Sequence, residues 1–94
     1  MFDREEAERR AADFLARESK AWGPSSRVRL IPEYCFVDGG QFIALYDHID
    51  YLDHGQEDMQ LGGNLPIAVD SASGFCRFVD WDDMDDFVER GLLE

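Results

Sequence analysis

The stretch at residues 61–78, LGGNLPIAVDSASGFCRF, constrains the fold of this 94-residue chain most strongly. Two glycines and Asn64 adopt left-handed backbone conformations at little cost, and Pro66 fixes its φ near −65°, so a sharp turn should precede residue 67. An apolar run then fills residues 67–69, Asp, Ser and Gly turn chemistry fills 70–74, and a second β-prone run begins at Phe75. The stretch therefore predicts a loop that leads into a β-hairpin.

The same stretch resembles a known family. A leucine, a Gly-Asn pair and a proline precede an apolar strand that ends in Asp-x-x-Ser-Gly, and this pattern is similar to that of the immunity protein 35 family, which includes the YrhB-like domains. The matching residues are Leu61, Gly63, Asn64, Pro66, Asp70, Ser73 and Gly74. Residues 42–46, followed by Tyr51, Leu52 and Gly55, resemble the family's aromatic strand and its Tyr-Leu-x-x-Gly continuation. The two blocks together cover about half of the chain.

Charge is the unusual part of the composition. The chain has 21 acidic and 9 basic residues, for a formal net charge of −12, whereas its hydrophobic content of 45% is typical of one folded domain over residues 1–94. A field of this sign disfavours nucleic acid and anionic membranes as partners and speeds encounter with a basic protein. The charged N-terminus lacks the apolar run of a secretory signal, so a cytoplasmic protein is expected, as a monomer or a homodimer.

A helix is expected at the start of the chain. Asp3 can cap it, with Glu6 as the capping-box partner, and Ala7, Ala11 and Leu15 then share one face. The two cysteines, Cys35 and Cys76, lie far apart in the sequence without a Cys-x-x-Cys motif. We interpret them as small buried thiols, with a disulfide or redox role as the alternative.

The middle of the chain has a β pattern. Pro32 interrupts an apolar run over residues 28–37, which indicates an edge strand or a bulge. The Asp-Gly-Gly sequence at 38–40 predicts a hairpin turn, and the continuous apolar run at 42–46 predicts a central strand with both faces covered.

A second helix is expected after Asp80, which can serve as its N-cap. Apolar residues then recur at helical spacing, at Trp81, Met84, Phe87, Val88 and Leu92. Antiparallel strands between two terminal helices predict an α+β fold. We expect an antiparallel sheet of about four strands, with the N-terminal and the C-terminal helix packed on one face. Trp81 is interpreted as a core residue of the second helix, with an exposed interface anchor as the alternative.

Two segments contain more carboxylates than capping requires: the segment at 47–60 and the second helix. We predict that these acids, with nearby aromatic side chains, bind a partner, with a merely solvated face as the alternative. The candidate partner-binding residues are Tyr46, Asp47, Asp50, Tyr51, Asp53, Glu57, Asp58, Trp81, Asp82, Asp83, Asp85 and Asp86. The histidines His48 and His54 fit neither a His-Glu-x-x-His motif nor an EF-hand, so no metal or cofactor is expected.

Three functions are compatible with these features. The family resemblance implies an immunity protein that binds a cognate bacterial polymorphic toxin and occludes its active site, with the toxin domain expected to be basic. The YrhB-like branch of the resemblance implies instead a chaperone or general protein-binding domain. An enzyme is not expected, because no nucleophile and base have a recognisable spacing and nothing in the sequence indicates a buried carboxylate pair.

Overall fold

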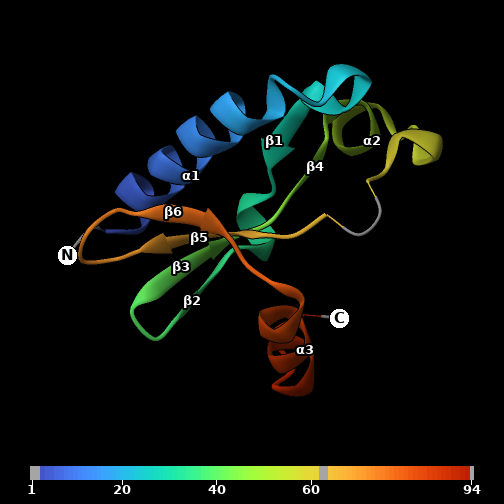
Figure 1. Ribbon diagram of the computed structural model, residues 1–94. Helices are drawn as coiled ribbons and strands as arrows, with labels where there is room; N and C mark the ends of the chain where they lie inside the picture. The colour runs from blue at the N-terminus through green and yellow to red at the C-terminus, as the bar shows by residue number, and fades with distance from the viewer. Residues whose placement is uncertain (1–2, 62–63, 94) are drawn as a thin grey trace.

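The computed structural model describes residues 3–61 and 64–93 and has the predicted α+β class. The helices are α1 (Arg4–Ser19), α2 (Ile49–His54) and α3 (Trp81–Glu89), and the 3-10 turns are η1 (Gly23–Ser26), η2 (Pro32–Tyr34) and η3 (Glu57–Met59). The strands are β1 (Val28–Leu30), β2 (Phe36–Asp38), β3 (Gln41–Ala44), β4 (Tyr46–His48), β5 (Ile67–Asp70) and β6 (Cys76–Phe78). Figure 1 shows the strands between α1 and α3.

All strand pairs in the described residues are antiparallel. One sheet has the order β2-β3-β5-β6, and a smaller sheet pairs β1 with β4. The predicted strand at 42–46 is divided at Leu45, opposite the point where Pro32 begins η2. Ile31 N donates to Leu45 O across this break (2.9 Å), so one long hairpin bends into two paired segments. Pro32 therefore interrupts the pairing, as the sequence predicts.

The predicted hairpin is confirmed as β5 and β6. In its turn, the Asp70 carboxylate accepts hydrogen bonds from the backbone N–H groups of Ala72 and Ser73, and Gly74 has a left-handed φ of 77°. The predicted entry turn is tested only at Asn64, since residues 62 and 63 lie outside the described residues. Asn64 does not have a positive φ; its side-chain amide donates to Tyr46 O (3.0 Å) and so fastens the loop to β4.

The helix α1 covers one face of the larger sheet. Its buried residues Ala7, Ala11 and Leu15 belong to a core cluster with Phe42 and Val69. The side chain of Asp3 accepts from Glu6 N (2.8 Å), which confirms the predicted N-cap. Glu6 itself receives hydrogen bonds from Arg9 and Arg10 on the outer face.

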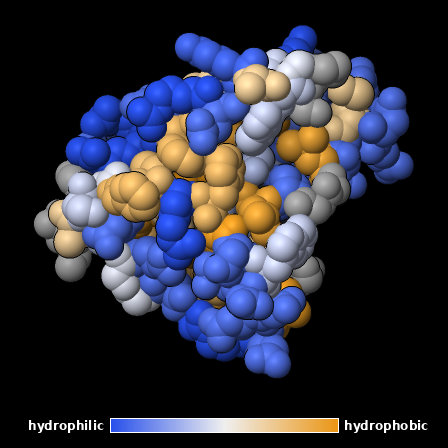
Figure 2. Space-filling view, viewed as in Figure 1, coloured by the Kyte–Doolittle hydropathy of each residue, from blue (hydrophilic) through white to orange (hydrophobic). Residues whose placement is uncertain are grey.

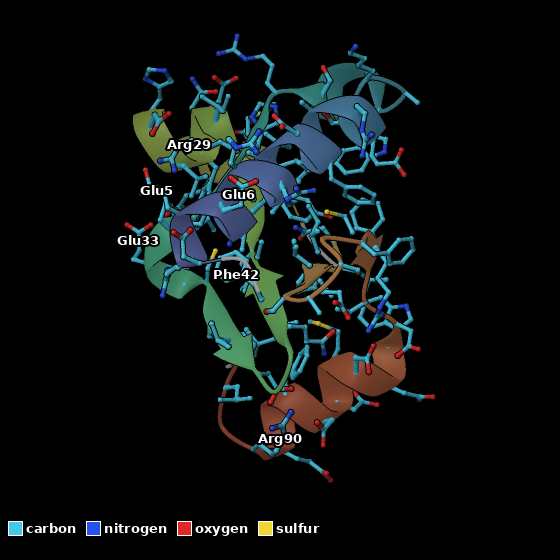
Figure 3. All side chains as sticks on the ribbon, turned by 90° about the vertical axis from the view of Figure 1, so that its left-hand side faces the viewer. Glu5, Glu6, Arg29, Glu33, Phe42 and Arg90 are labelled. Carbon is cyan, nitrogen blue, oxygen red and sulfur yellow. The ribbon has the colours of Figure 1, made fainter. Side chains whose placement is uncertain are left out.

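The helix α3 covers the opposite face, so the expectation that both helices pack on one face is wrong. Phe87 belongs to a second cluster with Ile43, Ala68 and Val79. Neighbouring residues of a strand point to opposite faces, and β3 and β5 are apolar on both. Each face therefore buries its own helix. At the end of α3, Arg90 donates two hydrogen bonds to Asp38 at the β2–β3 turn (2.9 and 2.8 Å; Figure 3).

Candidate functional site

An open groove of about 1360 Å³ lies between α2 and η3 on one side and the end of α3 on the other. In Figure 1, α2 lies beside β4 of the smaller sheet, and α3 lies below the larger sheet. Tyr51 and Leu52 line the groove from α2, Glu57 from η3, and Met84 and Leu92 from the α3 region. Of the predicted partner-binding residues, Tyr46, Asp47, Tyr51 and Glu57 line the groove, whereas those of α3 do not.

The helix α2 begins within the segment that the sequence left irregular. His48 caps it, because Nδ1 accepts from Asp50 N (3.1 Å), and Gly55 ends it with a left-handed φ of 67°. Asp50 forms an ion pair with Arg27, just before β1 (3.2 Å), and Asp53 forms one with Arg29 of β1 (2.7 Å). These two predicted binding residues therefore already hold α2 on the smaller sheet.

Tyr46 and Asp47 are buried, so their prediction as surface contacts is corrected. Tyr46 is only 5% exposed, stacks on Trp22, and donates from its hydroxyl to Leu65 O (2.8 Å). Asp47 is 7% exposed, and its Oδ1 accepts from the backbone N–H groups of both His48 (2.7 Å) and Leu61 (2.8 Å). Both side chains line the floor of the groove and are held there by these contacts within the fold.

Tyr46 gives the first testable prediction. Burial raises the pKa of its phenol to about 12, and the Asn64 amide offsets part of the rise. Because the folded-state pKa exceeds the unfolded value near 10, the contribution of the phenol to stability is full below about pH 10 and is lost as the pH rises towards 12. Tyr46→Phe should cost about 1 kcal/mol at pH 7 and should lose less stability than the wild type between pH 10 and 12.

Urea denaturation at pH 7, 10 and 11 measures the free energy of unfolding of both proteins. The difference between wild type and variant removes the effect of the other groups that titrate at alkaline pH, since both proteins contain them. Equal losses of stability in the two proteins above pH 10 would contradict the assignment.

The carboxylates of α3 divide into two groups. Asp80 and Asp83 form a reciprocal capping box, and Asp83 also pairs with Arg77 (3.3 Å). Asp86 pairs with Arg90 (2.7 Å). Among the described residues, Asp82 and Asp85 have no ion pair, and the same holds for Glu57 and Asp58 on η3. These four remain as carboxylates free to attract a partner.

Trp81 is 59% exposed at the start of α3, so its interpretation as a core residue is wrong and the alternative of an exposed position holds. Several apolar residues that line the groove were not predicted as site residues from the sequence, among them Leu45, Leu52, Met84 and Leu92. The helical spacing of Met84 was recognised, but spacing alone gives no signal that a groove lies beside it.

A second depression, of about 770 Å³, lies between α1 and the β5–β6 hairpin. It is lined by Phe75, which is 66% exposed, and by Arg9, Arg10 and Arg17. Figure 2 shows hydrophobic side chains gathered over the sheet between the mainly hydrophilic surfaces of α1 and α3. The three arginines at the rim of the second depression distinguish it from the groove, which carries acidic residues.

The cysteines are both free, and burial raises the pKa of each thiol above its usual value. Cys35 is buried and Cys76 half-buried, in line with a packing role. No group of three or more His, Cys, Asp and Glu side chains that could hold a metal occurs within residues 3–61 and 64–93. None of the described helices is long and apolar enough to cross a membrane.

Comparisons of the chain with protein-family models, with curated proteins and with solved structures find no match. The geometry of the groove and its free carboxylates is therefore the basis for a functional proposal, beside the resemblance stated above.

Proposed function

We propose that this protein is an immunity protein that binds a basic bacterial toxin domain in the cytoplasm and neutralises it by covering the active site. The observation that supports the proposal most is the groove, which Glu57 lines, together with the unpaired carboxylates of the neighbouring η3 and α3. Glu57 and Asp58 lie on η3, and Asp82 and Asp85 lie on α3. With a net charge of −12, such a surface suits a protein that must find a cationic cleft quickly.

The inhibition would be steric. A segment of the toxin that lies in the groove buries Tyr51, Leu52 and Met84, which supply apolar contact, while the carboxylates occupy the positions of the toxin's own anionic substrate. No bond is made or broken, and no residue of this chain acts as a catalyst.

A YrhB-like chaperone is the second candidate, and one observation favours it. Exposed apolar side chains at Trp81 and Val88, 59% and 51% exposed, lie beside the acids of α3. Such a surface could hold unfolded chains weakly and without selection.

A pull-down from native lysate at low salt and at about 0.5 M salt tests the proposal. We expect one stoichiometric basic partner, released by the high salt because exposed charge contacts are then screened. The partner's gene should stop growth of a bacterial host, and co-expression of this chain should restore it.

A triple variant, Glu57→Gln with Asp82→Asn and Asp85→Asn, should bind the purified partner about tenfold more weakly or worse. The matched control is Glu5→Gln with Asp13→Asn and Glu18→Gln on α1, which removes the same charge from residues that do not line the groove and should stay within about twofold. Capture of many unfolded proteins favours the chaperone, and equal weakening by the two variants contradicts the groove as the binding site.

A further inference from the structure

The outer face of α3 carries a stripe of exposed apolar side chains. Trp81 and Val88 lie at i and i+7 of α3 and are 59% and 51% exposed. Residues at this spacing share one side of a helix, and these two lie about 10 Å apart along its axis at 1.5 Å per residue. Leu92, which is 38% exposed, follows the end of the helix, after the left-handed turn at Gly91. The three are among the six large hydrophobic residues that are exposed in the described part of the chain.

The fold does not need this stripe. The helix α3 packs on the sheet through Phe87 and Met84, and the chain turns back after the helix so that Leu93 joins the same cluster. Leu92 instead lines the groove, so the stripe continues the groove wall outward. Contiguous exposed apolar surface of this kind marks an interaction site.

An acidic band runs beside the stripe. Asp82, Asp85 and Glu89 fall on one flank of α3 by helical spacing, and none of them has an ion pair within the residues that the structure describes. The nearby arginines are engaged elsewhere: Arg77 pairs with Asp83, and Arg90 pairs with Asp38 and Asp86. The negative charge of the band is therefore left without compensation next to an apolar surface.

We propose that the stripe and the acidic band form one docking surface for a basic amphipathic helix of the partner. Trp81 and Val88 are spaced like successive a positions of a helix-pairing seam, and the exposed part of the half-buried Met84 lies at the d position between them. A helix therefore fits this surface better than an extended strand. Lysine or arginine side chains on its flank would lie over Asp82, Asp85 and Glu89. The docking surface is inferred from α3 alone, whereas the identification of its partner as the toxin rests on the proposed function.

A second copy of this chain is a less suitable occupant. Two copies paired through α3 would bring two acidic bands together, and each chain carries a net charge of −12. Like charges placed together across an interface oppose association.

The docking surface can be tested with a defined probe. The probe is a fluorescent 14-residue peptide of leucine and lysine, with the leucines at helical spacing, and the comparison peptide has the same composition in scrambled order. Fluorescence anisotropy measures the binding of each to the full chain. We expect Trp81→Ala to weaken the helical peptide about tenfold or more. The matched control, Phe75→Ala, removes an equally exposed aromatic side chain from the basic depression and should change the affinity less than about twofold.

Charge is tested in the same assay. Asp82→Asn with Asp85→Asn and Glu89→Gln should weaken the helical peptide and reduce the salt dependence of its binding. The scrambled peptide should bind more weakly and should be insensitive to Trp81→Ala.

Equal binding of the two peptides, or equal binding of the helical peptide to wild type and Trp81→Ala, would overturn the docking surface. A dimer in solution that Trp81→Ala dissociates would also overturn it, in favour of a second copy. If Trp81→Ala still neutralises a captured toxin, the docking inference fails and the immunity function stands. If the peptides behave as expected but no toxin is captured, the docking surface stands and the immunity function fails.

Discussion

Replacing Phe87 with alanine is expected to lower the free energy of unfolding by about 3 to 5 kcal/mol. Phe87 is 2% exposed and attaches α3 to the sheet. Its ring meets Phe36 edge-on, with 5.4 Å between the ring centroids, and packs against Ile43 and Val79. Truncation loses both the burial and the aromatic contact and leaves a cavity that the short helix cannot fill. Urea denaturation at neutral pH measures the loss.

Val88→Ala is the matched control for this prediction. Val88 is the next residue of the same helix but is 51% exposed, so its truncation should change the free energy of unfolding by no more than about 0.5 kcal/mol. Equal losses in the two variants would mean that α3 does not pack on the sheet through Phe87. Hydrogen exchange in α3 should rise in Phe87→Ala before it rises in β3 or β5, because the helix loses its main attachment.

The sequence predicted the helix but not the face that it covers. The cap at Asp80 and the apolar spacing around Met84 and Phe87 are local signals, and both are borne out. The apolar run at Phe42 and Ile43 also indicated a strand covered on both faces, which is correct. Periodicity shows which side of a helix is apolar, but it does not show which face of the sheet receives that side, since this depends on the path of the chain after β6.

The candidate site was predicted only in part, because helical spacing does not show which residues of a helix point to the sheet. Trp81 and Phe87 both fit helical spacing, yet only Phe87 points to the sheet, and the sequence pattern could not choose between them. The burial of Tyr46 and Asp47 was not predicted, because their hydrogen-bond partners Leu65 and Leu61 lie 19 and 14 residues away. No local pattern reveals such long-range contacts.

The sequence shows where the acidic residues are concentrated, but it does not show which of them form ion pairs within the fold. Their number in α3 was evident, and Asp80 was recognised as a cap. The pairing of Asp83 with Arg77 and that of Arg90 with Asp38 depend on the strand and the turn that α3 packs against, whereas the i,i+4 pair of Asp86 with Arg90 is local. Only the structure therefore separates the carboxylates that stabilise the fold from those that remain for a partner.

Asp47→Ala is expected to lower the free energy of unfolding by about 2 to 4 kcal/mol, because it leaves the His48 and Leu61 backbone N–H groups without their acceptor. Asp47→Asn should cost much less. One oxygen, Oδ1, accepts both hydrogen bonds, and the asparagine carbonyl can take its place, although without the added strength of a charged acceptor. Urea denaturation of both variants at pH 7 measures the difference.

Asp58→Ala is the control for Asp47, since Asp58 is an exposed acid of the same segment and should change stability by no more than about 0.5 kcal/mol. A loss in Asp47→Asn as large as that in Asp47→Ala would mean that the charge is needed, and a loss in Asp47→Ala no larger than the control would remove its structural role. Asp47→Asn also separates folding from binding. It keeps the groove and deletes one charge beneath it, so full neutralisation of a toxin by this variant would assign Asp47 to the scaffold and leave attraction of the partner to the unpaired carboxylates of η3 and α3.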